Sequence, residues 1–302
     1  MRKLLLILFF VLLLGRSYAR ERDTTYISAY SEKFALKGFS GRKVLSFVVS
    51  ADEGPMVCSP NTPQDLGVGF SWNGFGLSLS YGFGFTADRK RERSKIIDLQ
   101  LHHYARTFLF DGYLQDYRGF SFGDRIDAEF LPHMRLTQIG GTFQYVLNHH
   151  RFSCRAVFNQ SEKQRRSAGS LLLGGGLYYA DVEADEVATK EREHNFFLGP
   201  TAGYVYCWII KKNFYVSIAF SAGANLGLER LDQALYVYPV IGARFSAGYT
   251  GDTWAIGVSG IANTLFVDAG PKTNMNLNSQ LLRVTFSHRF DIPYKKNAIA
   301  LR

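Results

Sequence analysis

A segment of regular alternation near residue 80 places the strongest constraint on what this chain can fold into. From Phe75 to Phe85, every second residue is Phe, Leu or Tyr, and the residues between them are Gly or Ser. Because successive side chains of a β-strand point to opposite faces, one face of this segment is apolar and the other is small and polar. At about 3.3 Å per residue and a tilt of about 45°, it spans ~26 Å, the height of the apolar band of an outer-membrane barrel. The segment therefore predicts a strand that crosses a membrane.

The same period continues from Ile97 to Arg106, with larger polar groups on the inner face. A secreted β-sandwich alternates in the same way, since its strands also have one buried and one solvated face. Long candidate strands, aromatic residues near strand ends and a polar face rich in Gly and Ser favour the membrane barrel. The apolar content of 46% excludes a disordered chain, and the 29 Gly and 15% aromatic residues argue against a helical bundle.

Thirteen segments of the chain show a strand pattern. They are 34–50, 64–72, 75–85, 97–106, 112–121, 134–146, 151–161, 168–181, 196–208, 214–226, 235–249, 254–266 and 277–290. Single-chain bacterial barrels normally have an even number of strands, so one assignment is wrong. Either 34–50 is two short strands broken between Gly38 and Gly41, or one of the segments does not span. We expect an all-β, antiparallel transmembrane barrel of about 12 strands, within a range of 10–14.

The N-terminus has the features of a secretory signal peptide. Arg2 and Lys3 precede an apolar run from Leu4 to Leu14, and small residues end the segment at Ala19. The apolar run rises only ~16 Å as a helix, about half of the hydrocarbon core, so a spanning helix is the weaker interpretation. The predicted organisation is a signal peptide over 1–19, a lead-in over 20–33, the barrel over 34–290 and a C-terminal tail over 291–302. The signal peptide and the barrel pattern together predict export to the outer membrane of a Gram-negative bacterium.

The three cysteines carry no recognisable site. Cys58, Cys154 and Cys207 are odd in number and widely spaced, without a CxxC pair or a histidine-rich neighbourhood. Neither a disulfide framework nor a bound metal is predicted, and no sequence motif implies a cofactor.

Two stretches carry a resemblance to a known family. The segment Cys58–Tyr81 (CSPNTPQDLGVGFSWNGFGLSLSY) and the segment Phe158–Tyr179 (FNQSEKQRRSAGSLLLGGGLYY) resemble an uncharacterised family of exported Bacteroidota proteins, catalogued as domain of unknown function 4421. The resemblance extends roughly from Asp23 to Phe290. It implies an outer-membrane barrel and supplies no catalytic residues. The barrel-assembly machinery commonly recognises an aromatic residue at the end of the last strand, and Phe290 is such a residue. Here a tail of residues 291–302 follows it.

A first candidate site lies in the polar segment between two apolar-faced strands. Asn159, Glu162, Arg165 and Arg166 stand there within eight positions. Since the planar guanidinium makes bidentate contacts with phosphate, these residues suggest a site at the barrel rim for an anionic headgroup or saccharide. The alternative is a solvated loop without a ligand.

A second candidate is a charged network in the lumen. Strand parity places Asp98, His102 and Arg106 on the inner face; other inner charges are expected at Arg155, Arg244, Arg283 and Arg289. Buried charges need partners, and here arginines outnumber carboxylates. The network is either a structural plug of ion pairs that fills a narrow lumen or an anion-preferring passage.

The remaining features leave three classes of function open. Five basic residues form a loop that is either simply solvated, the favoured interpretation, or in contact with lipopolysaccharide phosphates: Arg89, Lys90, Arg91, Arg93 and Lys95. Export makes nucleic acid an implausible partner. No HExxH or P-loop pattern occurs, and no spacing ties a serine to a histidine. We expect a non-enzymatic structural or envelope-interaction protein that contacts outer-membrane lipid and lipopolysaccharide; the alternatives are a narrow solute pore and a lipid-modifying enzyme.

Overall fold

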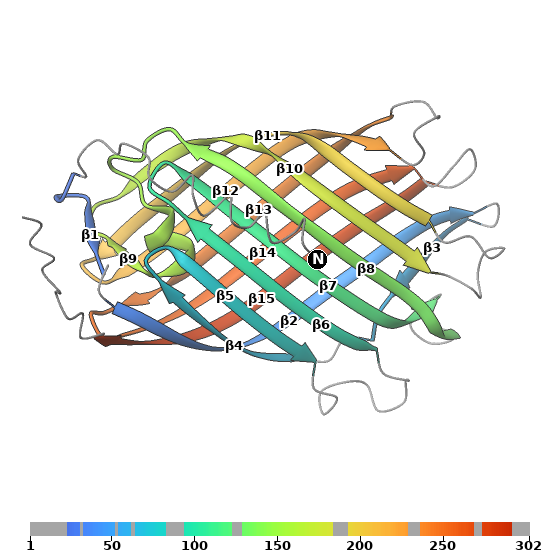
Figure 1. The fold of residues 1–302 in the computed structure, drawn as a ribbon, viewed down its shortest axis with the longest axis horizontal. Coiled ribbons are helices and arrows are strands. Elements are labelled where there is room, and N and C mark those ends of the chain that lie inside the picture. The colour runs from blue at the N-terminus through green and yellow to red at the C-terminus, as the bar shows by residue number, and fades with distance from the viewer. Residues whose placement is uncertain are drawn as a thin grey trace, which may run out of the picture.

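The computed structural model describes residues 23–30, 33–51, 54–61, 64–82, 94–122, 129–183, 193–228, 236–268 and 274–291. These residues form a closed antiparallel β-barrel (Figure 1). The predicted signal peptide and the tail beyond Asp291 lie outside the described residues. In the described ranges, no helix is both long and apolar enough to cross a membrane.

The main sheet has thirteen strands, of which twelve form the wall. The wall strands are β2 (Lys33–Ala51), β4 (Asp65–Trp72), β5 (Phe75–Gly82), β6 (Lys95–Tyr104), β7 (Phe108–Phe122), β8 (Glu129–Val146), β10 (Ala168–Glu183), β11 (Glu193–Lys211), β12 (Phe214–Leu228), β13 (Tyr236–Thr250), β14 (Trp254–Asp268) and β15 (Asn274–Asp291). The barrel closes where β15 pairs with β2, from Asp291↔Lys33 to Met275↔Val49. The prediction of about twelve strands is confirmed.

The thirteenth strand of the sheet, β3 (Gly54–Ser59), is not expected from the sequence, whose pattern predicts a polar connection there. It pairs with the end of β2 and, at two positions, with β7. The suggestion that 34–50 is broken at its glycines is also wrong, because β2 runs through Gly38 and Gly41 without interruption.

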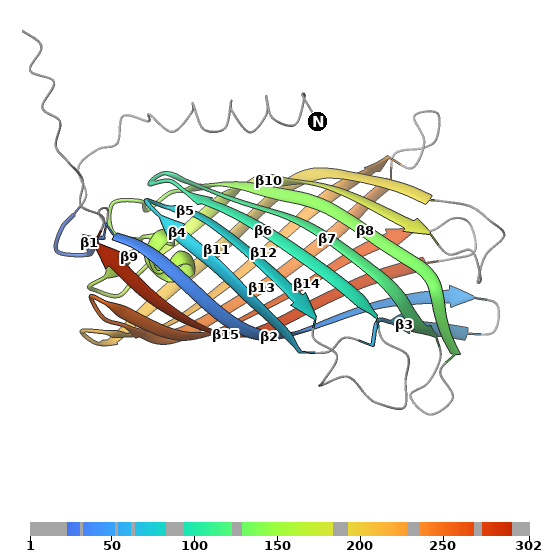
Figure 2. The same ribbon diagram turned by 60° about the horizontal axis from the view of Figure 1, so that its bottom comes forward.

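The surplus candidate strand is 151–161, which lies inside the barrel and not in its wall. Arg155–Asn159 form one π-helical turn, η1, and β9 (Glu162–Gln164) pairs antiparallel with β1 (Ile27–Ala29). Figure 2 shows these pieces at one end of the barrel. Odd-numbered and even-numbered residues are both buried in this segment, because the wall encloses it. The apolar residues that this enclosure requires are the reason why the sequence suggested a strand.

Residues 147–167 together with 23–30 are called the plug, and the end of the barrel that holds them is the plug end. The other connections at this end are short: 73–74, 105–107, 212–213 and 251–253. The opposite end, called the loop end, carries the longer connections, such as 83–94 and 184–192. Removing 151–161 from the wall restores a regular alternation of short and long connections.

Side chains on the wall follow the predicted alternation. On β5, Leu79 and Tyr81 point outward and are 49% and 50% exposed, whereas Gly76 and Ser80 are buried inside. All three tryptophans, Trp72, Trp208 and Trp254, lie outward beside plug-end turns. An apolar outer surface with aromatic residues at its edge is what a lipid bilayer requires of a barrel.

The lumen departs from the expected lining of Gly, Ser and Arg. Near the loop end, an apolar cluster fills part of it: Leu45, Ile96, Tyr117, Phe120, Leu131, Met134 and Leu136. A β-bulge in β7 at Gly119, with φ of 83°, shifts the parity so that both Tyr117 and Phe120 point inward. A bulge of this kind cannot be read from period-two alternation, because it breaks the period.

Candidate functional site

An apolar face anchors the plug to one side of the wall. Phe152, Cys154 and Val157 of the plug are fully or almost fully buried. They belong to one cluster with wall residues from six strands, β6, β7, β8, β10, β11 and β12: Tyr104, Leu109, Val146, Ala168, Leu172, Val205, Cys207, Tyr215 and Ala219. Burial of this apolar surface holds the plug against that half of the barrel.

Hydrogen bonds also anchor the plug, and they reach both β12 and β15. Gln160, which follows η1, has a left-handed backbone with φ of 54°. Arg289 of β15 donates from Nη2 to the Gln160 carbonyl oxygen at 2.8 Å, and the Gln160 side-chain amide donates to the Tyr215 hydroxyl at 3.0 Å. Ser287 Oγ donates to Gln160 Oε1 at 3.2 Å. A single plug residue is thus tied to β12 and β15.

Arg155 connects the plug to the β4–β5 turn. Its Nε donates to the Tyr104 carbonyl oxygen at 2.5 Å, and its Nη1 lies 3.4 Å from Glu162 Oε1. Gly74 in the turn has φ of 84°, and a Cβ built there would lie 2.6 Å from Arg155 Nε. Glycine therefore satisfies two demands at this turn: a backbone that other residues rarely adopt, and room for the guanidinium.

The N-terminal lead-in forms the outer layer of the plug. Tyr26 lies between two guanidinium groups, with Arg151 at 5.3 Å and Arg166 at 5.7 Å from its ring centroid. The ring centroid of Tyr30 lies 4.5 Å from the guanidinium carbon of Arg289, and the Tyr30 hydroxyl donates to the Gly251 carbonyl oxygen. This part of the plug is therefore attached both to segment 147–167 and to the barrel.

The four residues predicted to form a rim site do not share a surface. Asn159 and Glu162 are buried inside the plug, where Lys37 donates to Asn159 and Ser153 donates to Glu162 at 2.6 Å. Arg165 and Arg166 are exposed on the outer face of the plug, beside the lead-in. The grouping fails because the chain turns between these pairs, so that one pair points into the barrel and the other away from it.

Two members of the predicted luminal network meet at Asp111. Asp111 Oδ1 accepts from the Tyr104 hydroxyl at 2.6 Å and lies 2.6 Å from His102 Nδ1. Its Oδ2 lies 3.0 Å from Arg244 Nη1. Asp111 was not among the predicted residues, although it stands at an inward position of β7 that parity would have identified.

Asp98, the third predicted residue on β6, belongs to a separate pair. Lys43 Nζ lies 3.0 Å from Asp98 Oδ2, and both side chains are buried. Gln115 and Gln100 also donate to Asp98. Lys43 was missed, yet it shares the inward parity of Phe39 on β2.

Two predicted network residues lie elsewhere. Arg106 is in the 105–107 turn beyond the end of β6, so strand parity does not apply to it. Arg155 is on η1 and pairs with Glu162, as described above. In contrast, Arg283 lies inside the barrel on β15, as predicted.

A chamber remains in the lumen between the plug and the loop-end cluster. Its larger cavity has a volume of about 230 Å³. Amides, hydroxyls and two tyrosines supply most of its polar lining: Gln100, Gln115, Gln138, Gln144, Asn263, Thr142, Thr201, Thr264, Ser221, Ser279, Tyr113 and Tyr178. Leucine, valine and isoleucine side chains fill the space between these groups.

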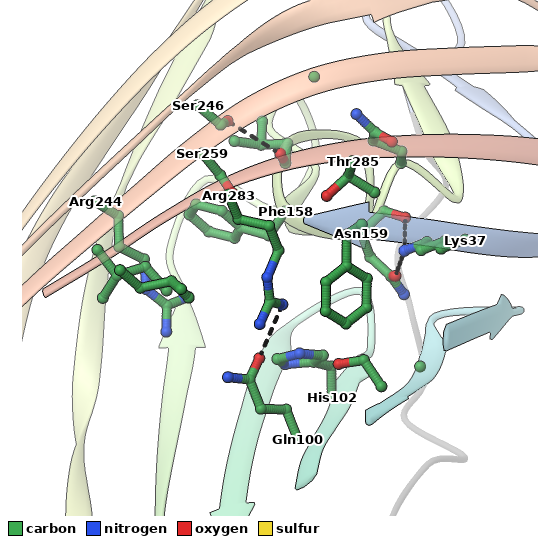
Figure 3. A pocket seen from close by; sticks show the side chains of 18 of the residues that line it. Lys37, Gln100, His102, Phe158, Asn159, Arg244, Ser246, Ser259, Arg283 and Thr285 are labelled. Atoms are coloured by element: carbon green, nitrogen blue, oxygen red, sulfur yellow. Dashed lines mark hydrogen bonds between the residues drawn. The ribbon is translucent and has the colours of Figure 1, made fainter. Parts of the chain in front are cut away.

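A smaller cavity of about 130 Å³ adjoins the chamber on its plug side (Figure 3). Both cavities are lined by Gln100, His102, Phe158 and Arg244, so they adjoin at these residues. Lys37 and Arg283 line only the smaller cavity, together with Ser259 and Thr285. The plug contributes Phe158, Asn159 and Gln160 to its floor.

The described residues show no group of three or more His, Cys, Asp or Glu side chains that could hold a metal ion. Cys154 and Cys207 are buried free thiols. Burial raises the pKa of the Cys154 thiol, and the negative charge of Asp111 adds to this effect. A thiol of this kind is a packing group and not a nucleophile.

Comparisons with solved structures find matches of low similarity that extend over most of the chain. The chain is similar to OmpT of Vibrio cholerae (5% identity, 85% of this chain and 98% of that chain, TM-score 0.32) and to the translocator domain of autotransporter NalP from Neisseria meningitidis (12%, 85% and 88%, 0.39). It is also similar to the NanC porin (11%, 81% and 98%, 0.33). At these identities and TM-scores, the three structures indicate nothing about the ligand or activity of this chain. A search of curated proteins finds no match. The sequence profile described as "Domain of unknown function (DUF4421)" matches residues 21–290.

Proposed function

Since this chain belongs to the DUF4421 family, which carries no activity in its description, we propose a function from the geometry of the lumen. The protein is an outer-membrane barrel that binds an anionic, hydroxyl-rich ligand, a glycan or a lipid headgroup, in its luminal chamber. It neither conducts solutes nor catalyses a reaction. The observation that carries this proposal is the chamber itself, with the plug as its floor.

Contacts around the lumen support a closed floor. The plug packs against β6, β7, β8, β10, β11 and β12 through its apolar face, and it is hydrogen-bonded to β2, β13 and β15. Arg155 fastens it to the β4–β5 turn. A lumen closed in this manner at the plug end leaves only the loop end for entry, which suits binding and opposes passage.

The lining of the chamber supports the class of ligand. Amide and hydroxyl groups can both donate and accept hydrogen bonds, as the hydroxyls of a sugar do. Tyrosine rings offer flat apolar surface with a polar tip. Around the two cavities, the described wall strands point five cations inward (Lys37, Lys43, Arg244, Arg283 and Arg289) beside the carboxylates of Asp65, Asp98 and Asp111. The surplus of positive charge favours an anion.

The lengths of the connections orient the barrel. Outer-membrane barrels have short periplasmic turns and long extracellular loops, so the plug end faces the periplasm. We propose that the ligand enters from the loop end and that the signal peptide is removed near Ala19 on export. Arg165 and Arg166 then face the periplasm, away from lipopolysaccharide. The geometry therefore moves the ligand contacts from these two residues to the chamber.

The charged groups around His102 support a role without catalysis. A histidine paired with a carboxylate resembles a general base, and His102 is paired with Asp111. The Arg244 guanidinium already neutralises Asp111 from its other oxygen. The Asp111 carboxylate is thus shared among Arg244, Tyr104 and His102, an arrangement that fits a structural cluster in the wall.

Conductance measurements test the closed floor. Reconstituted into planar bilayers, the mature protein should give no resolved single-channel steps. Regular steps would contradict the proposal and favour the narrow pore. Labelled phospholipid and lipid A, incubated with the solubilised protein, should be recovered unchanged; conversion would favour the lipid-modifying enzyme.

A chamber-filling variant tests the binding site. Thr201 lines the larger cavity from β11, and the next residue, Ala202, points outward. Thr201→Trp should abolish retention on immobilised lipopolysaccharide, because the indole occupies the cavity. Ala202→Trp adds the same volume to the lipid-facing side and should retain the wild-type behaviour. Equal retention by both variants would place any binding outside the lumen.

A further inference from the structure

We infer that the plug side of the chamber is an anion site built from Arg283 and Lys37, which seats a single carboxylate or phosphate monoester of the ligand. This inference rests on the proposed function, because it names the part of the chamber that recognises the acid group. It assigns a role to two cations that the ion-pair network does not use.

Arg283 reaches into the cavity without a carboxylate partner. It extends from β15 toward Gln100 on β6, where its Nη1 lies 3.4 Å from Gln100 Oε1 (Figure 3). Its Nε is buried and has no hydrogen-bond partner among the residues that the structure describes. The Phe39 ring centroid lies 4.0 Å from the guanidinium carbon, and this contact fixes the plane of the group. A fixed guanidinium with a free edge is suited to a bidentate oxyanion.

Lys37 approaches the same cavity from β2. Its Nζ donates to the carbonyl oxygen of Asn159 at 2.8 Å and to the side-chain oxygen of Asn159 at 2.5 Å. Both acceptors are neutral, so they stabilise the ammonium less than a carboxylate would. Within the described part of the chain, no carboxylate lies at ion-pairing distance from Lys37 or Arg283.

The other inward cations have close partners, as expected of side chains with a structural role. Lys43 is paired with Asp98 and Arg244 with Asp111, each at 3.0 Å. Arg289 is surrounded by the oxygens of Gln160, Gly251 and Thr250. Asp65 and Asp98 offset the charge of Arg283 only through space. A buried cation without a close counter-charge is costly, and a bound anion removes that cost.

The surroundings of the two cations define the rest of the ligand. Ser259 and Thr285 line the small cavity and offer hydroxyl donors to an oxyanion. A volume of about 130 Å³ accommodates an acid group and a few further atoms, not a whole sugar chain. The ligand must continue past Gln100 and His102 into the larger cavity, whose polar lining is mostly uncharged. The site therefore selects a hydroxylated body with one acid group, oriented with that group toward the plug.

Calorimetric titration of the solubilised mature protein tests the site with four probes: glucuronate, glucose 6-phosphate, glucose and inorganic phosphate. One or both of the acidic sugars should bind, and glucose should bind at least about tenfold more weakly, since a charged hydrogen-bonding group contributes about that factor. Comparison of glucuronate with glucose 6-phosphate separates a carboxylate from a phosphate ligand. Binding of inorganic phosphate alone at the affinity of the sugar would overturn the inferred selection of a hydroxylated body.

Variants assign the effect to the two residues. Arg283→Gln and Lys37→Gln should each weaken binding of the acidic sugar at least about tenfold and leave binding of glucose unchanged. Arg42→Gln removes a charge from the outward face of β2 and should have no effect. Arg283→Lys keeps the charge and should give an intermediate affinity, which distinguishes recognition from a loss of folding. Folding of every variant is checked by its shift in gel mobility on heating.

The outcomes separate this inference from the proposed function. If glucose and glucuronate bind equally and Thr201→Trp abolishes both, the anion site is wrong and luminal binding stands. If the barrel conducts but acidic sugars still bind through Arg283, the closed floor is wrong and the anion site stands. If Arg283→Gln and Lys37→Gln bind the acidic sugars as the wild type does, the inference is overturned.

Discussion

Arg289, on the last strand of the barrel, holds the backbone carbonyl of Gln160 in the plug. Two guanidinium nitrogens donate to that oxygen, Nη2 at 2.8 Å and Nε at 3.3 Å. Nη1 donates to the Gly251 carbonyl oxygen at 2.7 Å, so the same group also bonds to the β13–β14 turn. The left-handed Gln160 exposes its carbonyl oxygen to this cluster of donors, so the pair is a polar link between plug and wall.

Arg289→Gln should loosen the plug. The glutamine side chain is shorter and cannot replace the bonds to both carbonyl oxygens, so we expect the free energy of unfolding to fall by about 2 kcal/mol or more. In planar bilayers, the variant should show conductance steps that the wild type lacks. Arg42→Gln, on the outward face, is the control and should stay silent. A silent Arg289→Gln would mean that apolar packing alone retains the plug.

Gly74→Ala should disturb the attachment of Arg155. A methyl group at this position meets the Arg155 guanidinium and the Tyr104 carbonyl oxygen, and the positive φ adds strain. We expect a lower midpoint of heat unfolding on gels. Gly38→Ala is a matched control, because nothing lies within 4 Å of a Cβ built at Gly38. Equal midpoints for the two variants would refute the close approach at the turn.

Asp98→Asn should destabilise the barrel by leaving Lys43 buried without its counter-charge, at a cost of about 3 kcal/mol. The second substitution, Lys43→Met, removes the ammonium group that has lost its counter-charge. The double variant should therefore recover most of the lost stability, since the introduced amide oxygen can still accept from the side-chain amides of Gln100 and Gln115. The measurement is urea unfolding in detergent. Additive losses in the double variant would show that the pair is not coupled.

Cys154 should react slowly with maleimide in the folded protein. Burial both shields the thiol and raises its pKa, so little thiolate forms as the pH rises toward about 9. In a Cys58→Ser, Cys207→Ala background, labelling should be complete only after unfolding. Arg289→Gln in the same background should accelerate labelling if the plug becomes mobile. Rapid labelling of the folded parent would contradict the buried position of η1.

Period-two alternation predicts the strands of the wall, although it also assigns the plug segment 151–161 to the wall. The outward Leu79 and inward Ser80 follow from the pleat of a strand, and the need for lipid to meet apolar side chains makes that pattern long and regular. The inward position of Arg283 follows from the same parity. The profile of the family confirms the resemblance carried by the two quoted segments.

The plug could not be predicted in this way. Its residues Phe152 and Val157 are buried against the wall from inside the barrel, and the sequence does not distinguish their apolar pattern from that of a wall strand. The contacts of Gln160 join positions more than fifty residues apart, so no local rule applies to them. The bulge at Gly119 likewise reverses which face the following β7 residues point to, and the alternation of apolar and polar residues does not predict it.

The two strands that close the barrel both bond to the plug: Lys37 of β2 reaches Asn159 and Arg289 of β15 reaches Gln160. The chain emerges with β2 first and β15 last, and the segment between β8 and β10 is synthesised midway. Asn159 and Gln160 are adjacent in the chain, so one turn of the plug spans the seam between the first and last wall strands. A chain without this turn would lose both contacts and would hold that seam by backbone pairing and wall side chains alone.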